Sequence, residues 1–327
     1  MSNDIKVIRW GIIGCGDVTE RKSGPAYQKV EGFALKAVMR RDASKAADYA
    51  QRHNVEKYYA DAELLINDPE IDAIYIATPP DSHKHYALKV AAAGKPCCIE
   101  KPMAPTWQEC LDICKSFEDK GVALFVAYYR RSLPRFLKVK EWIDNGAIGV
   151  VRHISWKLMR TPSPRDLSGE YNWRTDAAIA TGGYFDDLAS HGLDLFTYLL
   201  GNITDVNGLN LNQQGLYTAK DALVANWLHS SNVTGSGNWN FGAYEREDKV
   251  TIYGSKGTIT FAVFDEVPLL LSTANGNEEV VIAHPENIQL YHVQNMRDHL
   301  NGSELHPSTG ATAAHTSWVM DKISGNL

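Results

Sequence analysis

The chain of 327 residues is 44% hydrophobic and 22% charged, and its 33 basic and 39 acidic residues give a net charge of −6. This length is typical of two domains, and the lack of a basic run argues against nucleic acid or an anionic membrane surface as the main partner. The first four residues are polar rather than signal-like, and no apolar stretch approaches the roughly 18 residues that cross a bilayer, so we expect a cytoplasmic protein.

The first third of the chain alternates apolar strands with amphipathic helices. Strands are expected at 6–13, 35–39, 73–77, 97–99 and 123–127. Helices are expected between them, at 17–30, 43–52, 82–93 and 107–120. Nearly continuous apolar strands separated by such helices predict an α/β domain whose parallel sheet is covered on both faces, over residues 1–127.

After residue 128 the pattern changes to one of short strands. A helix at 132–145 and a strand at 150–159 precede a polar region, 161–181, and a helix at 184–200 follows it. Alternating runs at 206–211, 222–229, 234–240, 249–253, 258–263 and 280–282 predict one antiparallel sheet. Two helices, 288–300 and 311–324, end the chain. We therefore expect a second α/β domain over residues 128–327, with the boundary near 127–131.

The five cysteines match neither a disulfide framework nor a zinc site. Cys97 and Cys98 are adjacent in an apolar run, which favours reduced, mostly buried thiols. His83 and His85 form a pair without further ligands, so we expect no metal.

A glycine turn follows the first apolar strand and begins the first helix. Gly14 permits a tight turn, and Gly16 lets the backbone approach a pyrophosphate. The helix start at Asp17 and Val18 offers N–H groups and a partial positive charge to phosphates. Although Thr19 replaces the usual Gly or Ala at the third position, this placement predicts a Rossmann dinucleotide-binding domain.

Arg40 and Arg41 stand at the end of the second strand. An NAD-preferring fold usually has an acidic residue there to bind the ribose 2′-hydroxyl. Two guanidinium groups instead suit a 2′-phosphate, so we expect NADP(H) over NAD(H). The alternative is that both arginines are solvated, and Asp42 is well placed to cap the next helix.

Two further strand ends should lie at the same edge of the sheet as the glycine turn, where ligands of open α/β sheets bind. One strand leads into Thr78 and Pro79, with His83 in the helix that follows. The next leads into Glu100 and Lys101. An incidental histidine and an ordinary surface ion pair are the alternatives to functional roles.

In the second domain Asp187, His191 and Asp194 are spaced i, i+4, i+7, which puts them on one helical face. A carboxylate one turn before a histidine orients the ring and raises its basicity. A capping arrangement at a polar helix start is the alternative. Upstream, Trp173 and Arg174 either close over a ligand or anchor the loop.

Together these segments resemble the glucose–fructose oxidoreductase/inositol dehydrogenase family, also called the Gfo/Idh/MocA family. The most specific pairing is the Glu-Lys-Pro turn with the downstream Asp-x-x-x-His, and the resemblance runs in order over nearly the whole chain. The matching segments are 11–16, 77–80 with His83, 93–95, 100–102, 173–174, 182–183 and 187–194. Residues 128–131 match more loosely, and through them the resemblance puts Arg130 near the nicotinamide.

The resemblance implies reversible hydride transfer between NAD(P) and a carbinol carbon of a sugar, polyol or related cyclic alcohol. Lys101 would hydrogen-bond the reacting oxygen, His191 would donate or accept the proton, and Asp187 would position them or bind a neighbouring hydroxyl. A lysine beside a cationic nicotinamide has a lowered pKa, so whether Lys101 or His191 moves the proton stays open.

The resemblance also implies a large, mostly antiparallel open sheet in the second domain, through which members form homodimers or homotetramers. Thr78 and Pro79 would border the nicotinamide, with Glu100 near it. The complete set of candidate cofactor-binding residues is Gly14, Gly16, Asp17, Val18, Arg40, Arg41, Thr78, Pro79, His83, Glu100, Lys101, Arg130, Trp173 and Arg174.

Two other functions stay open: an NAD-dependent glycosidase acting by transient oxidation, and a non-catalytic NAD(P)-binding sensor or repressor of the same fold. The two arginines count against the first, and the intact Lys101, Asp187 and His191 count against the second. No motif identifies the small polyhydroxylated substrate, whose determinants we expect in residues 159–181 and on the open sheet.

Overall fold

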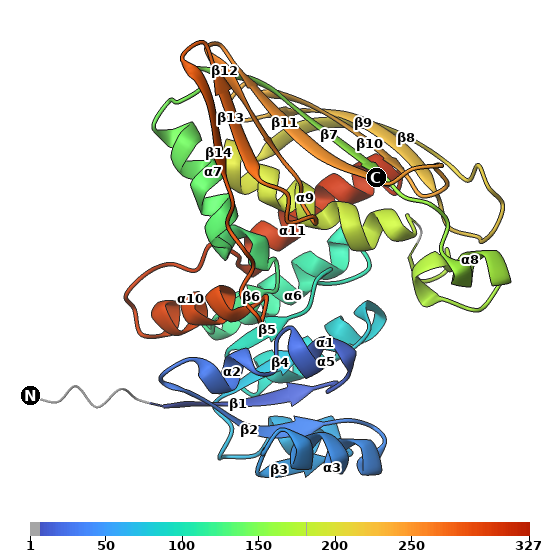
Figure 1. Cartoon of the computed structure of the whole chain (residues 1–327). Coiled ribbons are helices and arrows are strands. Elements are labelled where there is room, and N and C mark those ends of the chain that lie inside the picture. Colours follow the sequence, from blue (N-terminus) through green and yellow to red (C-terminus); the bar gives the residue numbers. More distant parts are fainter. Residues whose placement is uncertain (1–6, 181) are drawn as a thin grey trace, which may run out of the picture. The chain divides into compact units, whose positions relative to one another are not determined.

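The computed structural model describes residues 7–180 and 182–327, so the expected polar start, the first residue of the first strand and position 181 lie outside it. The described chain divides into two compact units (Figure 1). The first unit ends at Ser132 and also includes Pro285–Ala314. The second comprises Leu133–His284 and the residues from His315 onward. Residues 285–314, which the sequence analysis assigned to the second domain, therefore belong to the first unit.

The first unit is built on a parallel sheet with the strand order β3-β2-β1-β4-β5-β6. Its strands are β1 Ile8–Ile13, β2 Phe33–Met39, β3 Lys57–Tyr59, β4 Ala73–Ile76, β5 Cys97–Ile99 and β6 Leu124–Val126. The strand order reverses between β1 and β4, which is the switch point where such sheets bind ligands. The predicted Rossmann architecture is confirmed, except that the sequence analysis missed β3, an edge strand of three residues.

The helices of the first unit cover both faces of this sheet. They are α1 Asp17–Arg21, α2 Ala26–Lys29, α3 Ala43–Arg52, α4 Ala62–Ile66, α5 His83–Ala92, α6 Trp107–Lys120 and α10 Leu290–Leu300, together with the first residues of α11 Gly310–Ser324. The single helix expected at 17–30 is wrong, because the chain turns sharply between α1 and α2. A Cβ at Gly24 would lie 2.3 Å from the carbonyl oxygen of Thr19. The five-residue α4 was not predicted from the sequence either.

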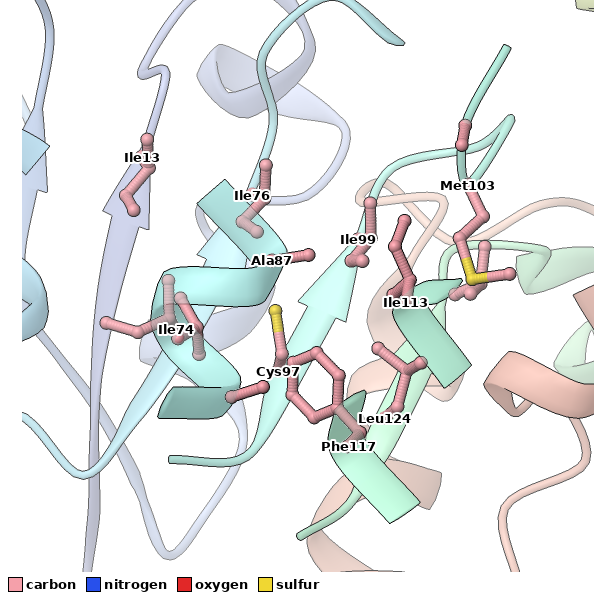
Figure 2. Packing of buried hydrophobic residues seen from close by; sticks show 14 of the residues in the cluster. Ile13, Ile74, Ile76, Ala87, Cys97, Ile99, Met103, Ile113, Phe117 and Leu124 are labelled. Carbon is pink, nitrogen blue, oxygen red and sulfur yellow. The ribbon is translucent and has the colours of Figure 1, made fainter. Parts of the chain in front are cut away.

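Each face of the first sheet buries its own apolar cluster, as the alternation of strand side chains requires. Figure 2 shows one of them, in which Ile76, Cys97 and Ile99 of the strands lie beside Ile113 and Phe117 of α6. Alternate strand residues enter the other cluster, so the neighbouring thiols of Cys97 and Cys98 face opposite sides. Both thiols are fully buried, and burial raises the pKa of each.

The second unit is built on a large sheet with the order β14-β13-β12-β11-β7-β10-β9-β8. Its strands are β7 Val151–Met159, β8 Ile203–Leu211, β9 Ala222–His229, β10 Thr234–Asn240, β11 Glu247–Gly254, β12 Gly257–Phe261, β13 Leu269–Thr273 and β14 Gly276–Val280. The pairing is antiparallel except between β7 and β10, which run parallel. The mostly antiparallel sheet that the family resemblance implies is confirmed. The strand pattern by itself predicted an entirely antiparallel sheet, and this is wrong because β7 and β10 run parallel. The run expected at 280–282 only touches the end of β14, and β13 was missed.

Helix α9, Tyr184–Leu200, lies against β7, and its bounds are those predicted. A Cβ at Gly192 would lie 2.4 Å from the ring of Trp156, so a glycine is needed for this close approach. The unit also contains α7 Pro134–Asp144, the short α8 Pro164–Ser168 and the 3₁₀ turn η3 Trp173–Thr175. Within the described residues no helix has the length and apolarity needed to cross a membrane.

Candidate functional site

The glycine turn after β1 is shaped by contacts to two other strand ends. Gly14 has a φ of +93°, and a Cβ there would lie 2.7 Å from Cγ2 and 2.9 Å from the backbone nitrogen of Thr78. Its own N–H donates to the carbonyl of Met39, at 2.9 Å. Gly14 is therefore required by the fold itself.

Gly16 differs from Gly14, because its backbone is extended, with a φ of −147° that any residue adopts. Apart from its chain neighbours, the nearest atom to a Cβ there would be the carbonyl oxygen of Gly14, at 3.9 Å. The space beside Gly16 is thus open, as the approach of a pyrophosphate requires.

Thr19, the unusual third residue of the fingerprint, closes the turn. Its buried hydroxyl accepts from the N–H of Gly16, at 3.0 Å, and donates to the Gly16 carbonyl, at 2.8 Å. Asp17 and Val18 begin α1, as expected, but this helix has only five residues. A shorter helix aligns fewer peptide dipoles, so the electrostatic contribution expected from a helix over 17–30 is reduced.

Arg40 follows β2 directly and lies beside the glycine turn, with its Nη1 donating to the carbonyl of Cys15 at 3.3 Å. Arg41 is exposed. Asp42 caps α3 by accepting from the backbone N–H groups of Ser44 and Lys45, at 3.1 and 3.3 Å. The capping role of Asp42 is confirmed, so of these three residues the two arginines are the ones available to a ligand.

Thr78 and Pro79 lead from β4 into the 3₁₀ turn η1, Pro80–Ser82. The hydroxyl of Ser82 lies within hydrogen-bond distance of Thr78 Oγ1 and of the Pro79 carbonyl, at 2.8 Å each. Thr78 is half-buried against Gly14, and Pro79 is exposed. The structure thus brings these residues to the glycine turn.

Glu100 is buried and bonded to the protein. Its Oε1 accepts from the hydroxyl of Tyr75, at 2.5 Å, and from Nε2 of Gln289, at 2.7 Å. Its Oε2 accepts from the backbone N–H of Lys101, at 3.2 Å. Its carboxylate thus holds the turn that carries Lys101, and the expected place of Glu100 near the nicotinamide stays a prediction. The side chain of Lys101 itself is half-buried.

His83 is fully buried at the start of α5. Its Nε2 lies 2.7 Å from the carbonyl of Thr78, and its Nδ1 lies 3.0 and 3.2 Å from the carbonyls of Pro102 and Met103. Both ring nitrogens therefore face the backbone. The ring thus ties the Thr78 loop to the residues that follow Lys101, and the predicted contact of His83 with the cofactor stays a prediction.

Arg130, which the looser match placed near the nicotinamide, is buried in the 3₁₀ turn η2, Tyr129–Ser132. Its guanidinium lies over the ring of Tyr129, 5.0 Å from the centroid. Its predicted contact with a cofactor stays a prediction.

In the second unit, Asp187 and His191 lie on the regular helix α9, as predicted. Asp187 Oδ2 accepts from Nε of Arg174 at 3.0 Å, and the Arg174 guanidinium stacks over Trp173 at 4.3 Å. Trp173 and Arg174 thus anchor their loop to α9. His191 is buried, and its ring meets that of Phe264 edge-on at 5.9 Å.

The other acidic residues of α9 have different surroundings. Asp194 is fully buried and its Oδ1 accepts from the hydroxyl of Thr316, at 3.1 Å, which indicates a structural role. Asp186 accepts from the N–H of Gly182, at 2.9 Å, and burial raises the pKa of its carboxyl to about 7. Asp186 was not among the predicted site residues, and its only signal in the sequence is its position before Asp187.

The polar region before α9 contains a cavity of about 270 Å³. The hydroxyl of Tyr184 donates to Asp166 at 2.7 Å and accepts from Nδ2 of Asn172 at 3.2 Å, which holds the cavity's two sides together. The residues that line the cavity are Asp166, Gly169, Glu170, Tyr171, Asn172, Thr175, Asp176, Leu216, Tyr217 and Thr218. Across residues 7–180 and 182–327, no group of three or more His, Cys, Asp or Glu side chains is placed to hold a metal ion.

Comparisons with known proteins agree with this arrangement. A family model described as an oxidoreductase family with an NAD-binding Rossmann fold (GFO_IDH_MocA) matches residues 8–128, and the GFO/IDH/MocA C-terminal domain matches residues 136–260. Oxidoreductase P35 of Formosa agariphila is 35% identical over 97% of this chain and 98% of that protein. The levoglucosan dehydrogenase of Pseudarthrobacter phenanthrenivorans is 29% identical over 74% of this chain and 56% of that protein.

A similar fold occurs in a solved structure of levoglucosan dehydrogenase in complex with NADH and levoglucosan. It has a TM-score of 0.84 and 23% sequence identity, and the match covers 97% of this chain and 96% of that one.

The two glycines of the turn should respond differently to substitution by alanine. Gly14→Ala is expected to destabilise the protein by about 2 kcal/mol or more, because its Cβ meets the backbone of Thr78 in a left-handed conformation. Gly16→Ala is expected to keep its stability but to bind NAD(P)H about 10- to 100-fold more weakly, because the Cβ occupies the pyrophosphate's space. Chemical denaturation and fluorescence titration measure the two effects, and unchanged cofactor affinity in Gly16→Ala would contradict this assignment.

Proposed function

The chain belongs to the Gfo/Idh/MocA oxidoreductase family, and on that premise we propose that it transfers hydride reversibly between a nicotinamide cofactor and a carbinol carbon of a sugar, polyol or related cyclic alcohol. The observation that carries the proposal is the edge of the first sheet. There the turn beside Gly16 is open, Thr78 lies against Gly14, and the Lys101 turn is held by Glu100. The relative named levoglucosan dehydrogenase supports the substrate class.

The residues of the first unit fit a dinucleotide. In the proposal the backbone at Gly14 and Gly16 receives the pyrophosphate, Arg40 lies at the adenosine ribose, and Thr78 borders the nicotinamide. The bound nicotinamide supplies or accepts the hydride. Neither Glu100 nor His83 needs to contact it, because both shape the Lys101 turn from within the protein.

The proton needs a separate acceptor. When a carbinol is oxidised, its carbon loses a hydride to the nicotinamide and its oxygen loses a proton to a protein group. His191 suits that transfer because imidazole titrates near neutral pH. Lys101 suits the reacting oxygen, where an ammonium group stabilises a developing alkoxide. Asp187, already oriented by Arg174, then accepts a hydrogen bond from a neighbouring substrate hydroxyl.

Replacing the proton-transfer groups tests this function. Lys101→Met and His191→Asn are each expected to lower kcat about 100- to 10,000-fold while the Kd for NAD(P)H changes little, because these side chains act on the reacting oxygen rather than on the cofactor. The measurement is formation of reduced nicotinamide across a panel of sugars, inositols and anhydrosugars.

Lys120→Met is the matched control, since Lys120 is exposed at the end of α6. Wild-type rates in Lys101→Met would contradict the assignment. Tight cofactor binding without turnover of any substrate would instead favour a sensor.

For the cofactor, we propose NADP(H) over NAD(H). Arg40 lies beside the glycine turn through its bond to the Cys15 carbonyl, and Arg41 is exposed next to it. Asp42, the nearest carboxylate in sequence, is already engaged by the N–H groups of Ser44 and Lys45. A 2′-phosphate would therefore meet two guanidinium groups.

Substituting both arginines should separate the two cofactors. Arg40→Asp combined with Arg41→Ala is expected to weaken NADPH binding about 10- to 100-fold, because charge-assisted hydrogen bonds to the phosphate are lost. Binding of NADH, which lacks that phosphate, should change much less. Equal losses for NADPH and NADH in calorimetric titrations would show that the arginines do not bind the 2′-phosphate.

We also propose that the chain forms a homodimer or homotetramer through the exposed face of the second sheet. That face carries apolar side chains such as Val224 of β9 and Tyr253 of β11, which are 41% and 43% exposed. Both line a hollow of about 630 Å³ on the strands. Exposed apolar groups gathered on one sheet face are typical of a protein interface.

Sedimentation velocity tests this proposal with the full chain. The wild type is expected to sediment as a dimer or tetramer, and Val224→Lys should shift it toward the monomer, because a charge would be buried at the interface. A monomeric wild type at micromolar concentration would contradict it.

A further inference from the structure

Arg160 follows β7 directly and shares an aromatic neighbour with His191. Its guanidinium lies over the ring of Phe264, 5.5 Å from the centroid. The ring of His191 meets the same phenyl ring edge-on, at 5.9 Å between centroids. Phe264 therefore connects the end of β7 to the histidine assigned to proton transfer.

The backbone of Arg160 is held on both sides. Its N–H donates to the carbonyl of Asn240, at 2.8 Å, and its own carbonyl accepts from the N–H of Ala243, at 3.0 Å. These bonds continue the pairing of β7 with β10 by one residue. With Phe264 under its head group, the side chain is preorganised before any ligand binds.

The guanidinium of Arg160 stands out among the arginines of this region. Arg174 pairs with Asp187 at 3.0 Å, and Arg246 pairs with Asp265. Arg160 is half-buried, and within the part of the chain that the structure describes its enclosed Nε has no hydrogen-bond partner. Leaving such a donor unsatisfied destabilises the protein, so a buried group of this kind calls for a partner.

The nearby carboxylates are engaged elsewhere. Asp248 accepts from Nε1 of Trp156 at 3.0 Å and from the backbone N–H of Phe264 at 2.6 Å. Burial, together with the charge of Arg246, lowers the pKa of Arg160, although the charges of Asp248, Asp265 and Asp187 act in the opposite direction. These acidic groups favour the charged form of the guanidinium, yet none of them is among its ion-pair partners.

The chemistry of the missing partner follows from the shape of a guanidinium. Its planar fork donates two parallel N–H bonds to a carboxylate, whereas a hydroxyl satisfies only one. We propose that Arg160 binds a carboxylate of the substrate, which makes the substrate a sugar acid, such as a uronate or aldonate, rather than a neutral polyol. The proposal rests on the function proposed above and names the substrate class of the same site.

Matched pairs of substrates test this inference. The wild type is expected to have a kcat/KM at least about tenfold higher for D-glucuronate than for D-glucose, and for D-galacturonate than for D-galactose. Arg160→Gln should raise KM for the acids about 10- to 100-fold and leave the values for neutral sugars unchanged, because only the carboxylate loses its partner. Arg160→Lys keeps the positive charge but not the planar fork, so its KM for the acids should fall between those of the wild type and Arg160→Gln.

Arg297→Gln is the matched control, because Arg297 lies on α10 and pairs with Asp298. Calorimetric titration of D-glucuronate and D-galacturonate into the protein with NAD(P)H gives a readout that does not depend on turnover, and denaturation verifies that each variant folds. If neutral sugars are turned over and Arg160→Gln does not change KM for the acids, this inference would be overturned but the proposed function would stand. If the acids bind through Arg160 but no substrate is turned over, the proposed function would be overturned and Arg160 would remain a carboxylate-binding residue. If the acids do not bind, this inference would be overturned.

Discussion

The edge of the first sheet depends on the hydrogen bonds that the buried carboxylate of Glu100 accepts. This carboxylate receives hydrogen bonds from Tyr75 on β4, from Gln289 at the start of α10 and from the backbone of Lys101. A buried carboxylate is stable only when such donors surround it, and each is worth about 1.5–3 kcal/mol. The charge of Glu100 thus ties a strand, a helix near the end of the chain and the Lys101 turn into one arrangement.

The remaining contacts at this edge extend the same constraint. His83 joins the Thr78 loop to the carbonyls of Pro102 and Met103, and Thr78 in turn packs against Gly14. Three strand ends are therefore tied to each other by buried polar groups rather than by flexible loops. Such a rigid support suits hydride transfer, in which small displacements of the reacting groups are costly.

In the second unit, the helix that carries His191 is held mainly by close packing rather than by a network of buried polar groups. Gly192 lets α9 lie directly on Trp156, and Asp194 binds Thr316 of α11, so the helix that carries His191 has a fixed rotation and height. Phe264 then brings the ring of His191 and the guanidinium of Arg160 to one aromatic surface. In the function and substrate class proposed above, this rigid placement would set a cation that recognises an acidic substrate beside the group that transfers the proton.

Local patterns in the sequence were enough to predict α3, α6 and α9 with their observed bounds, the turn at Gly14 and the pairing of Asp187 with His191 on one helical face. These features depend on periodicity, caps and backbone freedom, which act over a few residues. The roles of Glu100 and His83, the return of residues 285–314 to the first unit and the setting of Arg160 were decided only by the tertiary structure. Gln289, a partner of Glu100, and Phe264, the ring under Arg160, stand about 190 and 100 residues away from them, and only packing determines which distant groups meet.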